Sequence, residues 1–430
     1  MFQGPTVSVA IASAVMEKTY RRKTYQYKLR DSKVDELRKL SEFLVEDYRV
    51  TFKQAYGNML EVLSTKEDPR LMFTFAQFYD PTLHCFTFQD FLLPPTLEEF
   101  AHLLQLPVKD QAPYMIEDNF PDSADIAQAL CMKKDLIEST LQIKGNTQGL
   151  PSKLLFENAT LFSNSGSWDA FYASFALLIC GLVLFPSVKG FVDKTSINIF
   201  ISQNPVPTLL VYVLFSFHWR NMKKGGTISC CIPLLQNWIM SHLLKKGPFI
   251  DNVGNLKWSQ RLMSLDAKDI IWYSLNYLRI ELIFQCGEFP NVPLVSTKWG
   301  LINYSHILSL RQLGYPLKEK PKDRLLEELL LAEEVENPKL MKKMRRAWGK
   351  IQRVGKKELG KQLCTVTVSY ANWVKSMAKM IKLPYAWELS TCIKKPHAVV
   401  VSEVDRLKET IKKLEKENVG LRSSLIKVTS

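Results

Sequence analysis

The sequence lacks the short motifs that mark most catalytic sites. It has no phosphate-binding P-loop, no G-x-G-x-x-G, no H-E-x-x-H and no G-x-S-x-G. Its eight cysteines include no C-x-x-C pair, so neither a zinc ribbon nor a disulfide framework is indicated. We expect reduced, mostly buried thiols in an intracellular protein. We also expect no catalytic residues, no cofactor and no metal site, and we interpret the chain as a non-enzyme.

Three small groups of reactive side chains have simpler interpretations. Neighbouring residues of an extended segment point to opposite faces, which separates His84 from Cys85. Adjacent cysteines cannot both reach one tetrahedral zinc without strain, which argues against a site at Cys230 and Cys231. His218 and His242, which flank those cysteines in the sequence, are expected to be histidines with ordinary hydrogen bonds. Asp266 and Asp269 are expected as helix caps or first-turn charges.

Apolar runs long enough to cross a membrane are also lacking. Residues 170–188 contain an apolar part of 16 residues, which is short for a span. Residues 195–217 are interrupted by polar residues and two prolines. We expect both to be buried helices of a large soluble core, with no membrane partner. No basic region precedes the apolar N-terminal stretch, so a secretory signal is not expected.

Positive charge is abundant and concentrated. The formal net charge is +14. Residues 17–39 hold nine Lys or Arg against four Asp or Glu, and residues 339–361 hold ten against one. These two segments account for the whole excess, so a polyanion is expected to meet them rather than the body of the protein.

Turn residues punctuate otherwise helical segments, which predicts a mostly α fold: a large irregular helical domain with a C-terminal coiled-coil helix. One long helix is expected from Val34 to Leu63, a smaller one from Tyr370 to Ile381, and a short strand at residues 84–88. We expect a basic N-terminal arm at 1–31, a helical core at 32–316, a charged helical extension with a basic segment at 317–395, and a coiled coil at 396–430.

The C-terminal segment has a heptad seam with one polar position, Asn418, which favours a parallel two-stranded coil and a homodimer. The alternative is a single amphipathic helix docked on its own core. The seam consists of Val404, Leu407, Ile411, Leu414, Asn418, Leu421, Leu425 and Val428.

The basic segment carries an apolar stripe at helical spacing, made of Leu340, Met341, Met344, Trp348 and Ile351. Three interpretations remain open: a solvated helix that packs its stripe on the core, a face that contacts nucleic-acid phosphates, or a calmodulin-type or membrane-surface helix. The second would use backbone contacts without base readout. Its candidate residues are Lys342, Lys343, Arg345, Arg346, Lys350, Arg353, Lys356 and Lys357.

The stretch FTFQDFLLPPTLEEFAHLLQLPV, residues 86–108, contains a helix start at Thr96 with Glu99 at capping-box spacing. It resembles the entry motif of the plant mobile domain, a family also labelled aminotransferase-like. Further segments are similar to its legume transposon-associated branch, over roughly residues 50–380. They are FAQFYDP (75–81), GLVLFP (181–186), NPVPTLL (204–210), CGEFPNVPL (286–294), INYSHILSLRQLGYP (302–316) and RAWGKI (346–351).

The resemblance implies a mostly helical fold, plant origin and a nuclear location, with the cytoplasm as the alternative. It implies a role linked to transposon silencing and meristem maintenance, or a module of a retrotransposon or DNA transposon, and it supplies no catalytic residues. Two hypotheses follow. The chain is a non-enzymatic scaffold for unidentified protein partners, or it is a nucleic-acid-associated retrotransposon component that binds phosphates through residues 339–361.

Overall fold

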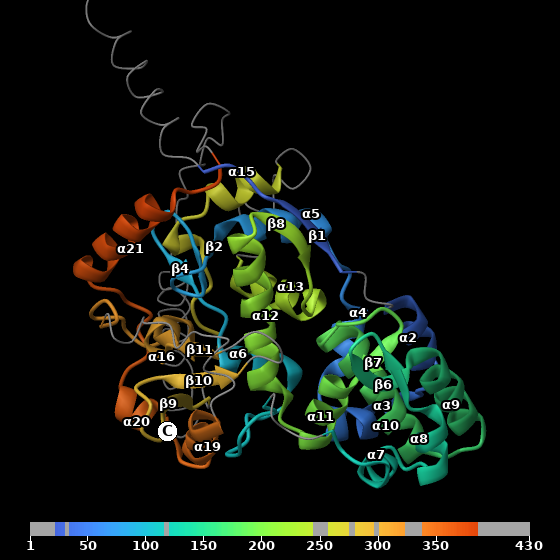
Figure 1. The fold of residues 1–430 in the computed structure, drawn as a ribbon. Helices are drawn as coiled ribbons and strands as arrows, with labels where there is room; N and C mark the ends of the chain where they lie inside the picture. The colour runs from blue at the N-terminus through green and yellow to red at the C-terminus, as the bar shows by residue number, and fades with distance from the viewer. Residues whose placement is uncertain are drawn as a thin grey trace, which may run out of the picture. The chain divides into compact units, whose positions relative to one another are not determined.

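The computed structural model describes residues 22–30, 34–115, 120–243, 257–274, 280–295, 301–322 and 338–385 (Figure 1). All of them belong to one of the chain's two compact units. Of these residues, 54% are helical and 15% lie in strands that form several small sheets. The expectation of a mostly α fold is therefore wrong, and the described chain is a mixed α/β fold. The predicted coiled coil at 396–430 lies outside the described residues.

The helices differ widely in length. They are α2 (Val34–Ser41), α3 (Glu46–Tyr56), α4 (Met59–Ser64), α5 (Pro69–Phe75), α6 (Leu97–Leu104), α7 (Ser123–Ala129), α8 (Lys134–Thr140), α9 (Ser152–Asn164), α10 (Trp168–Ile179), α11 (Lys194–Ser202), α12 (Pro205–Met222), α13 (Ile232–His242), α15 (Trp258–Met263), α16 (His306–Ser309), α19 (Pro338–Trp348), α20 (Lys356–Leu359) and α21 (Val368–Ile381). The described residues also form 3-10 helices at η1 (Ala76–Phe78), η3 (Ala267–Asp269) and η5 (Leu310–Leu313), and a π-helix at η2 (Cys180–Leu184).

The strands form five small sheets. Strand β1 (Gln26–Leu29) pairs in parallel with β8 (Gly225–Ile228). The other four sheets are antiparallel. Two have three strands each, in the order β2 (Tyr79–Asp80), β3 (Cys85–Thr87), β4 (Leu92–Leu93) and in the order β5 (Gln142–Lys144), β6 (Thr147–Pro151), β7 (Phe191–Asp193). In the remaining two, β9 (Leu282–Cys286) pairs with β12 (Ile351–Val354), and β10 (Val292–Val295) pairs with β11 (Leu301–Tyr304). Strand β3 lies within the predicted strand at 84–88. The others are too short, or pair with segments too distant, to leave a period-two pattern in the sequence.

The single helix expected from residue 34 to residue 63 is divided into α2, α3 and α4. The second break lies at Gly57, whose φ of +66° is in the left-handed region that glycine tolerates. A Cβ at this position would lie 2.2 Å from the carbonyl oxygen of Leu104. Asn58 also donates from its backbone and its side chain to Leu104 and Leu103. The break therefore lets this segment close the C-terminal end of α6.

The two long uncharged stretches are buried, as expected. Every residue from Ala170 to Pro186 is buried, through α10 and η2, and α12 is buried along most of its length. In the part of the chain that the structure describes, no helix is both long and apolar enough to cross a membrane. Five of the described cysteines, Cys85, Cys180, Cys230, Cys231 and Cys286, are buried free thiols, as predicted.

The segment after Pro316 packs on the preceding chain. Strand β12 pairs with β9 in an antiparallel register. Helix α21 places Tyr370 and Val374 in one apolar cluster with Leu83, Cys85 and Leu92. The predicted helix at 370–381 is confirmed, and it shares its core with β3 and β4.

Candidate nucleic-acid interface and the buried polar centre

Helix α19 separates apolar from charged side chains along its length. Met341, Met344 and Trp348 are 0% exposed. The Trp348 indole Nε1 donates a hydrogen bond of 3.1 Å to the carbonyl oxygen of Pro293 in β10. The helix ends at Trp348, and Ile351 begins β12, so the predicted stripe is helical only as far as the tryptophan.

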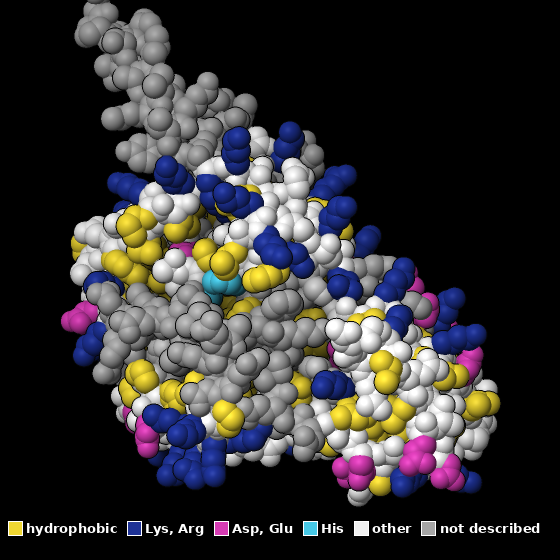
Figure 2. Space-filling model, in the orientation of Figure 1, with side chains coloured by type: hydrophobic (Ala, Val, Ile, Leu, Met, Phe, Trp, Pro, Cys, Tyr) yellow, Lys and Arg dark blue, Asp and Glu magenta, His cyan; other side chains and the backbone are white. Residues whose placement is uncertain are grey.

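The structure brings seven of the eight predicted nucleic-acid-binding residues to the surface of one continuous segment. We call this group the basic face, and Figure 2 shows lysine and arginine side chains gathered over α19 and α20. The basic face consists of Lys342, Lys343, Arg345 and Arg346 on α19, Lys350 in the following turn, and Lys356 and Lys357 on α20, all of them exposed.

Arg353 differs from the other seven because its side chain holds the fold together. It is half-buried, forms an ion pair with Asp110, and donates from Nη2 to the carbonyl oxygen of Val108 at 2.8 Å. It thereby ties β12 to the loop that follows α6. Two carboxylates lie beside the basic face: Glu288, 3.2 Å from Lys343 Nζ, and Glu358, which accepts from the N–H of Gly355.

Helix α6 packs against α12 and α13 (Figure 1) and is buried on nearly every side. Thr96 caps it, since its hydroxyl oxygen accepts from the N–H of Glu99 at 3.0 Å, as the sequence predicts. Glu98 and Glu99 are 5% and 0% exposed, although glutamate is rarely buried. Sequence reasoning missed this burial. The only signal was two acids at the start of an otherwise apolar helix.

The Glu99 carboxylate joins three separate parts of the chain. Its Oε2 accepts hydrogen bonds of 2.8 Å from Thr96 Oγ1, from Trp238 Nε1 of α13 and from Gln312 Nε2 of η5. Its Oε1 lies 2.9 Å from Nε2 of His242 as a buried ion pair. These contacts make Glu99 the acceptor at the centre of a buried polar network.

Both ring nitrogens of His242 face acceptors. Nδ1 lies 2.9 Å from the carbonyl oxygen of Ile271, and Nε2 faces the Glu99 carboxylate. Only an imidazolium can donate to both acceptors. Burial lowers the pKa of His242, but the Glu99 charge and the two acceptors outweigh it, so this pKa lies above its usual value. The contacts and the raised pKa both favour the imidazolium form of His242.

Glu98 accepts hydrogen bonds on the opposite side of α6. It accepts from the N–H of Ile283 in β9 and from the hydroxyl of Tyr304 in β11, both at 3.0 Å. Burial raises the pKa of Glu98 to about 7. The carboxyl lines a small pocket of about 260 Å³ together with His102, Glu281 and Arg353.

The other reactive groups do not assemble into a site. His242 bonds to Glu99, whereas the ring of His218 lies 5.4 Å from that of His84. Burial raises the pKa of Cys231 to about 12 and also raises that of Cys230. Asp266 and Asp269 form the capping box of η3. Over the described ranges, no three His, Cys, Asp or Glu side chains are placed to share a metal ion.

Residues 37–379 match the family described as Domain of unknown function (DUF7745). The chain belongs to this family. No curated protein and no solved structure matches the chain. The matched range of this DUF7745 chain contains both the buried polar network and the whole basic face. The predicted dimer seam, from Val404 to Val428, lies beyond the match and outside the described residues.

Proposed function

We propose that this DUF7745 chain is a non-catalytic interaction module that binds nucleic acid through its phosphates on the basic face. The observation that carries the proposal is the division of α19, in which Met341, Met344 and Trp348 are fully buried while the lysines and arginines are exposed. The cations are therefore mounted on a fixed helix. A polyanion gains affinity from such a surface by releasing its condensed counterions.

The burial of the apolar side of α19 argues against a calmodulin-type or membrane-surface helix. A calmodulin-type or membrane-surface helix must offer its apolar side to the partner. In α19 that side is occupied, with Met341, Met344 and Trp348 at 0% exposure. The helix would have to leave the core to present it. Packing on the core and binding phosphates, by contrast, use opposite sides of one helix and are compatible.

The non-catalytic character is supported by the buried acids, since Glu98, Glu99 and His242 all bond to structural partners. The resemblance to the plant mobile domain supports the wider setting that we propose: an interaction scaffold of the nucleus, derived from a transposon or acting in transposon silencing. Lys and Arg contacts to phosphates position a protein without reading bases, so we expect binding that ignores sequence.

We also propose that residues 396–430 form a parallel two-stranded coil that pairs two basic faces and so doubles the phosphate contacts. Light scattering of the full chain should give the mass of a dimer, and a chain without residues 397–430 the mass of a monomer. One monomer mass for both would contradict the coil and leave the basic face untouched.

Fluorescence anisotropy with two labelled duplexes of equal length and unrelated sequence tests the binding surface. Replacing Lys342, Arg345, Arg346 and Lys350 together by alanine should weaken both duplexes alike, by about tenfold or more at low salt. The matched control replaces four exposed lysines elsewhere, Lys133, Lys134, Lys153 and Lys189, and removes the same charge. Equal losses in both variants, or no loss in either, would contradict the basic face as the site.

A further inference from the structure

Four segments that lie far apart in the sequence meet beside β1 and are rich in lysine and arginine. Strand β1 pairs with β8, β8 packs on α12, and α5 packs on both β1 and α15. The segments 22–30, 66–75, 219–228 and 257–263 hold eleven Lys or Arg against two acids, a net charge of +9. Figure 2 shows lysine and arginine side chains along this edge of the molecule. The fold thus gathers charge that is dispersed along the chain.

We call the exposed cations of these segments the β1 surface. They are Lys23, Lys28, Lys66, Arg70, Lys223, Lys224 and Lys257. One of the two acids, Asp68, is occupied by the fold, because its carboxylate accepts from the N–H of Arg70 at 3.0 Å and from the indole N–H of Trp258 at 2.8 Å. Like charges gathered in this way repel one another and destabilise the fold, and an anionic partner removes the repulsion.

Three cations of these segments lie over aromatic rings, which restricts their movement. Each pair also covers one face of its ring. A single-stranded nucleic acid stacks its bases on open aromatic faces, so the covered faces argue against such a strand. The pairs are Arg22 on Tyr25, Lys223 on Trp219 and Arg261 on Trp258, at 4.8, 4.4 and 3.8 Å from the ring centres.

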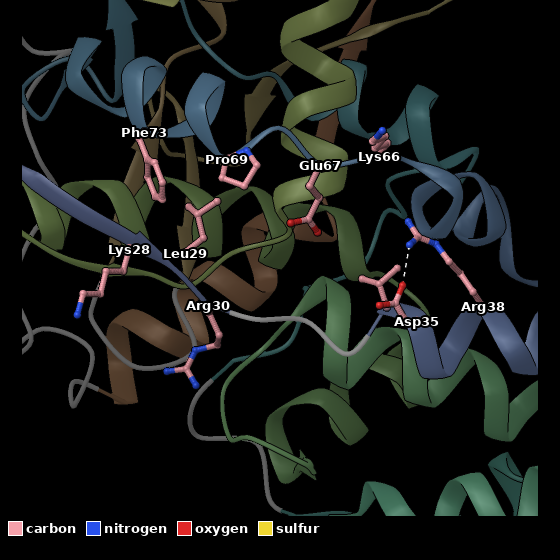
Figure 3. A pocket seen from close by; sticks show the side chains of 10 residues that line it. Lys28, Leu29, Arg30, Asp35, Arg38, Lys66, Glu67, Pro69 and Phe73 are labelled. Carbon is pink, nitrogen blue, oxygen red and sulfur yellow. Dashed lines mark hydrogen bonds and ion pairs between the residues drawn. The ribbon is translucent and has the colours of Figure 1, made fainter.

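The β1 surface borders an open hollow of about 520 Å³. Lys28 and Lys66 lie at its opposite ends, and Leu29, Pro69 and Phe73 form an apolar wall between them (Figure 3). A partner that spans the hollow therefore meets a cation at each end and apolar side chains in the middle.

The lining of the hollow keeps an excess of positive charge. Arg38 pairs with Asp35 at 2.9 Å (Figure 3), so these two charges compensate each other. The other charged side chains of the lining are three cations and one acid, Glu67. The hollow is therefore complementary to a partner with more negative than positive charge.

Hydrogen bonds fix both sides of the hollow. The N–H of Arg30 donates to the carbonyl oxygen of Ile228 at 2.9 Å, which continues the β1–β8 pairing. The side chain of Gln236 accepts from the N–H of Asp68 and donates to the carbonyl oxygen of Lys66, both at 2.7 Å. Binding therefore does not require these segments to become ordered first.

This arrangement suits an acidic protein segment better than a duplex. A duplex presents its phosphates in regular rows and has no apolar side chain to place in a hollow. An acidic segment carries carboxylates on flexible side chains, which reach cations at uneven spacing, and it can supply one large apolar side chain as an anchor.

We propose that the β1 surface docks an acidic segment of a partner protein. The segment places an apolar side chain against Leu29, Pro69 and Phe73, and carboxylates at Lys28 and Lys66. The inference goes beyond the proposed function, since it assigns a surface other than the basic face to a partner other than nucleic acid.

Fluorescence anisotropy of the full chain with three labelled peptides tests the docking. The first peptide has phenylalanine and leucine between acidic residues, the second replaces these two by serine, and the third replaces the acids by lysine. The first should bind about tenfold or more tightly than the second, because it buries apolar area, and the third should not bind.

Replacing Lys28, Lys66, Arg70 and Lys223 together by alanine should weaken both acidic peptides by about tenfold or more. Phe73→Ser should weaken the first peptide and leave the second unchanged, and Pro69→Ser, at an exposed position, should act in the same direction. The four-lysine control of the duplex experiment should bind both peptides as the parent does. Thermal unfolding shows which variants are folded.

Equal binding of the two acidic peptides, or parent affinity in the folded variant without the four cations, would overturn the docking. A loss of duplex binding in that variant, with no peptide bound by the parent, would also overturn it and assign the surface to nucleic acid. The basic-face variant should lose duplex binding and keep peptide binding, so the proposed function and this inference fail separately.

Discussion

Glu98 and Glu99 are adjacent in the sequence, yet they stabilise different parts of the molecule. One helical step rotates a side chain by about 100°. Glu98 therefore holds β9 and β11, whereas Glu99 holds α13 and η5. Through these two residues α6 bonds to segments that lie more than a hundred residues further along the chain. The two acids of the PTLEE stretch, residues 95–99, therefore have a structural role, since both bond to distant parts of the fold.

Glu98 makes stability depend on pH. Its folded-state pKa of about 7 lies above the ordinary value of 4.5, so the folded protein holds this proton more tightly. Its contribution is complete below pH 4.5 and is lost as pH rises towards 7, by up to about 3 kcal/mol. Glu98→Gln, a neutral isostere, should remove this loss in urea titrations between pH 5 and 8. Identical pH slopes in parent and variant would contradict the shift.

Glu99→Gln should be far more costly, because it leaves the buried His242 imidazolium without its counter-charge. Removing one partner of a buried pair costs about 3–5 kcal/mol. Since the folded-state pKa of His242 is raised, the pair's contribution is complete below pH 6.5 and declines as pH rises through the folded value. The variant's deficit should therefore shrink at high pH. The exposed control Glu138→Gln, paired with Lys134, should cost about 0.5 kcal/mol or less.

At the scale of elements, the junction between α3 and α4 is fixed by Gly57. Gly57→Ala places a Cβ at 2.2 Å from the Leu104 carbonyl oxygen, in addition to the strain of a left-handed alanine. Gly145 has a similar φ of +62° with nothing within 4 Å. Gly145→Ala should cost about 1–2 kcal/mol, and Gly57→Ala distinctly more. Thermal unfolding of both variants checks this, and equal costs would show that the contact with α6 is unimportant.

Elements with a clean helical period were predictable from the sequence. Helix α6 begins after Thr96, and α21 spans the predicted range. Strand β12 was not predictable, because Ile351 continues the helical spacing of Met344 and Trp348 while pairing with Cys286 of β9 decides its conformation. A partner so distant in sequence leaves no local signal, which is why a mostly α fold was expected.

The candidate site was predictable in part. The spacing of cations and apolar residues in α19 indicates which side is exposed. It cannot show that Arg353 bonds to Val108 and Asp110, or that Lys343 pairs with Glu288, since those partners come from other segments. Nor can it show that Glu98 and Glu99 are buried, because acids near a helix N-terminus are usually solvated.

At the scale of the whole molecule, the two basic segments have different forms. Residues 339–361 build an exposed surface on a helix whose other side is buried, whereas the described part of the N-terminal segment forms β1 and the start of α2 and borders a pocket. Exposed cations on a helix whose other side is buried suit a long polyanion, the ligand proposed for the basic face.

The dependence of duplex affinity on salt tests the central claim most directly. For each phosphate that the protein neutralises, the slope of log K against log salt changes by about 0.9. Replacing Lys342, Arg345, Arg346 and Lys350 by alanine should therefore flatten the slope by up to about 3.6, while the control lacking Lys133, Lys134, Lys153 and Lys189 keeps the parent slope. Parallel lines for the parent and the basic-face variant would contradict phosphate binding by α19.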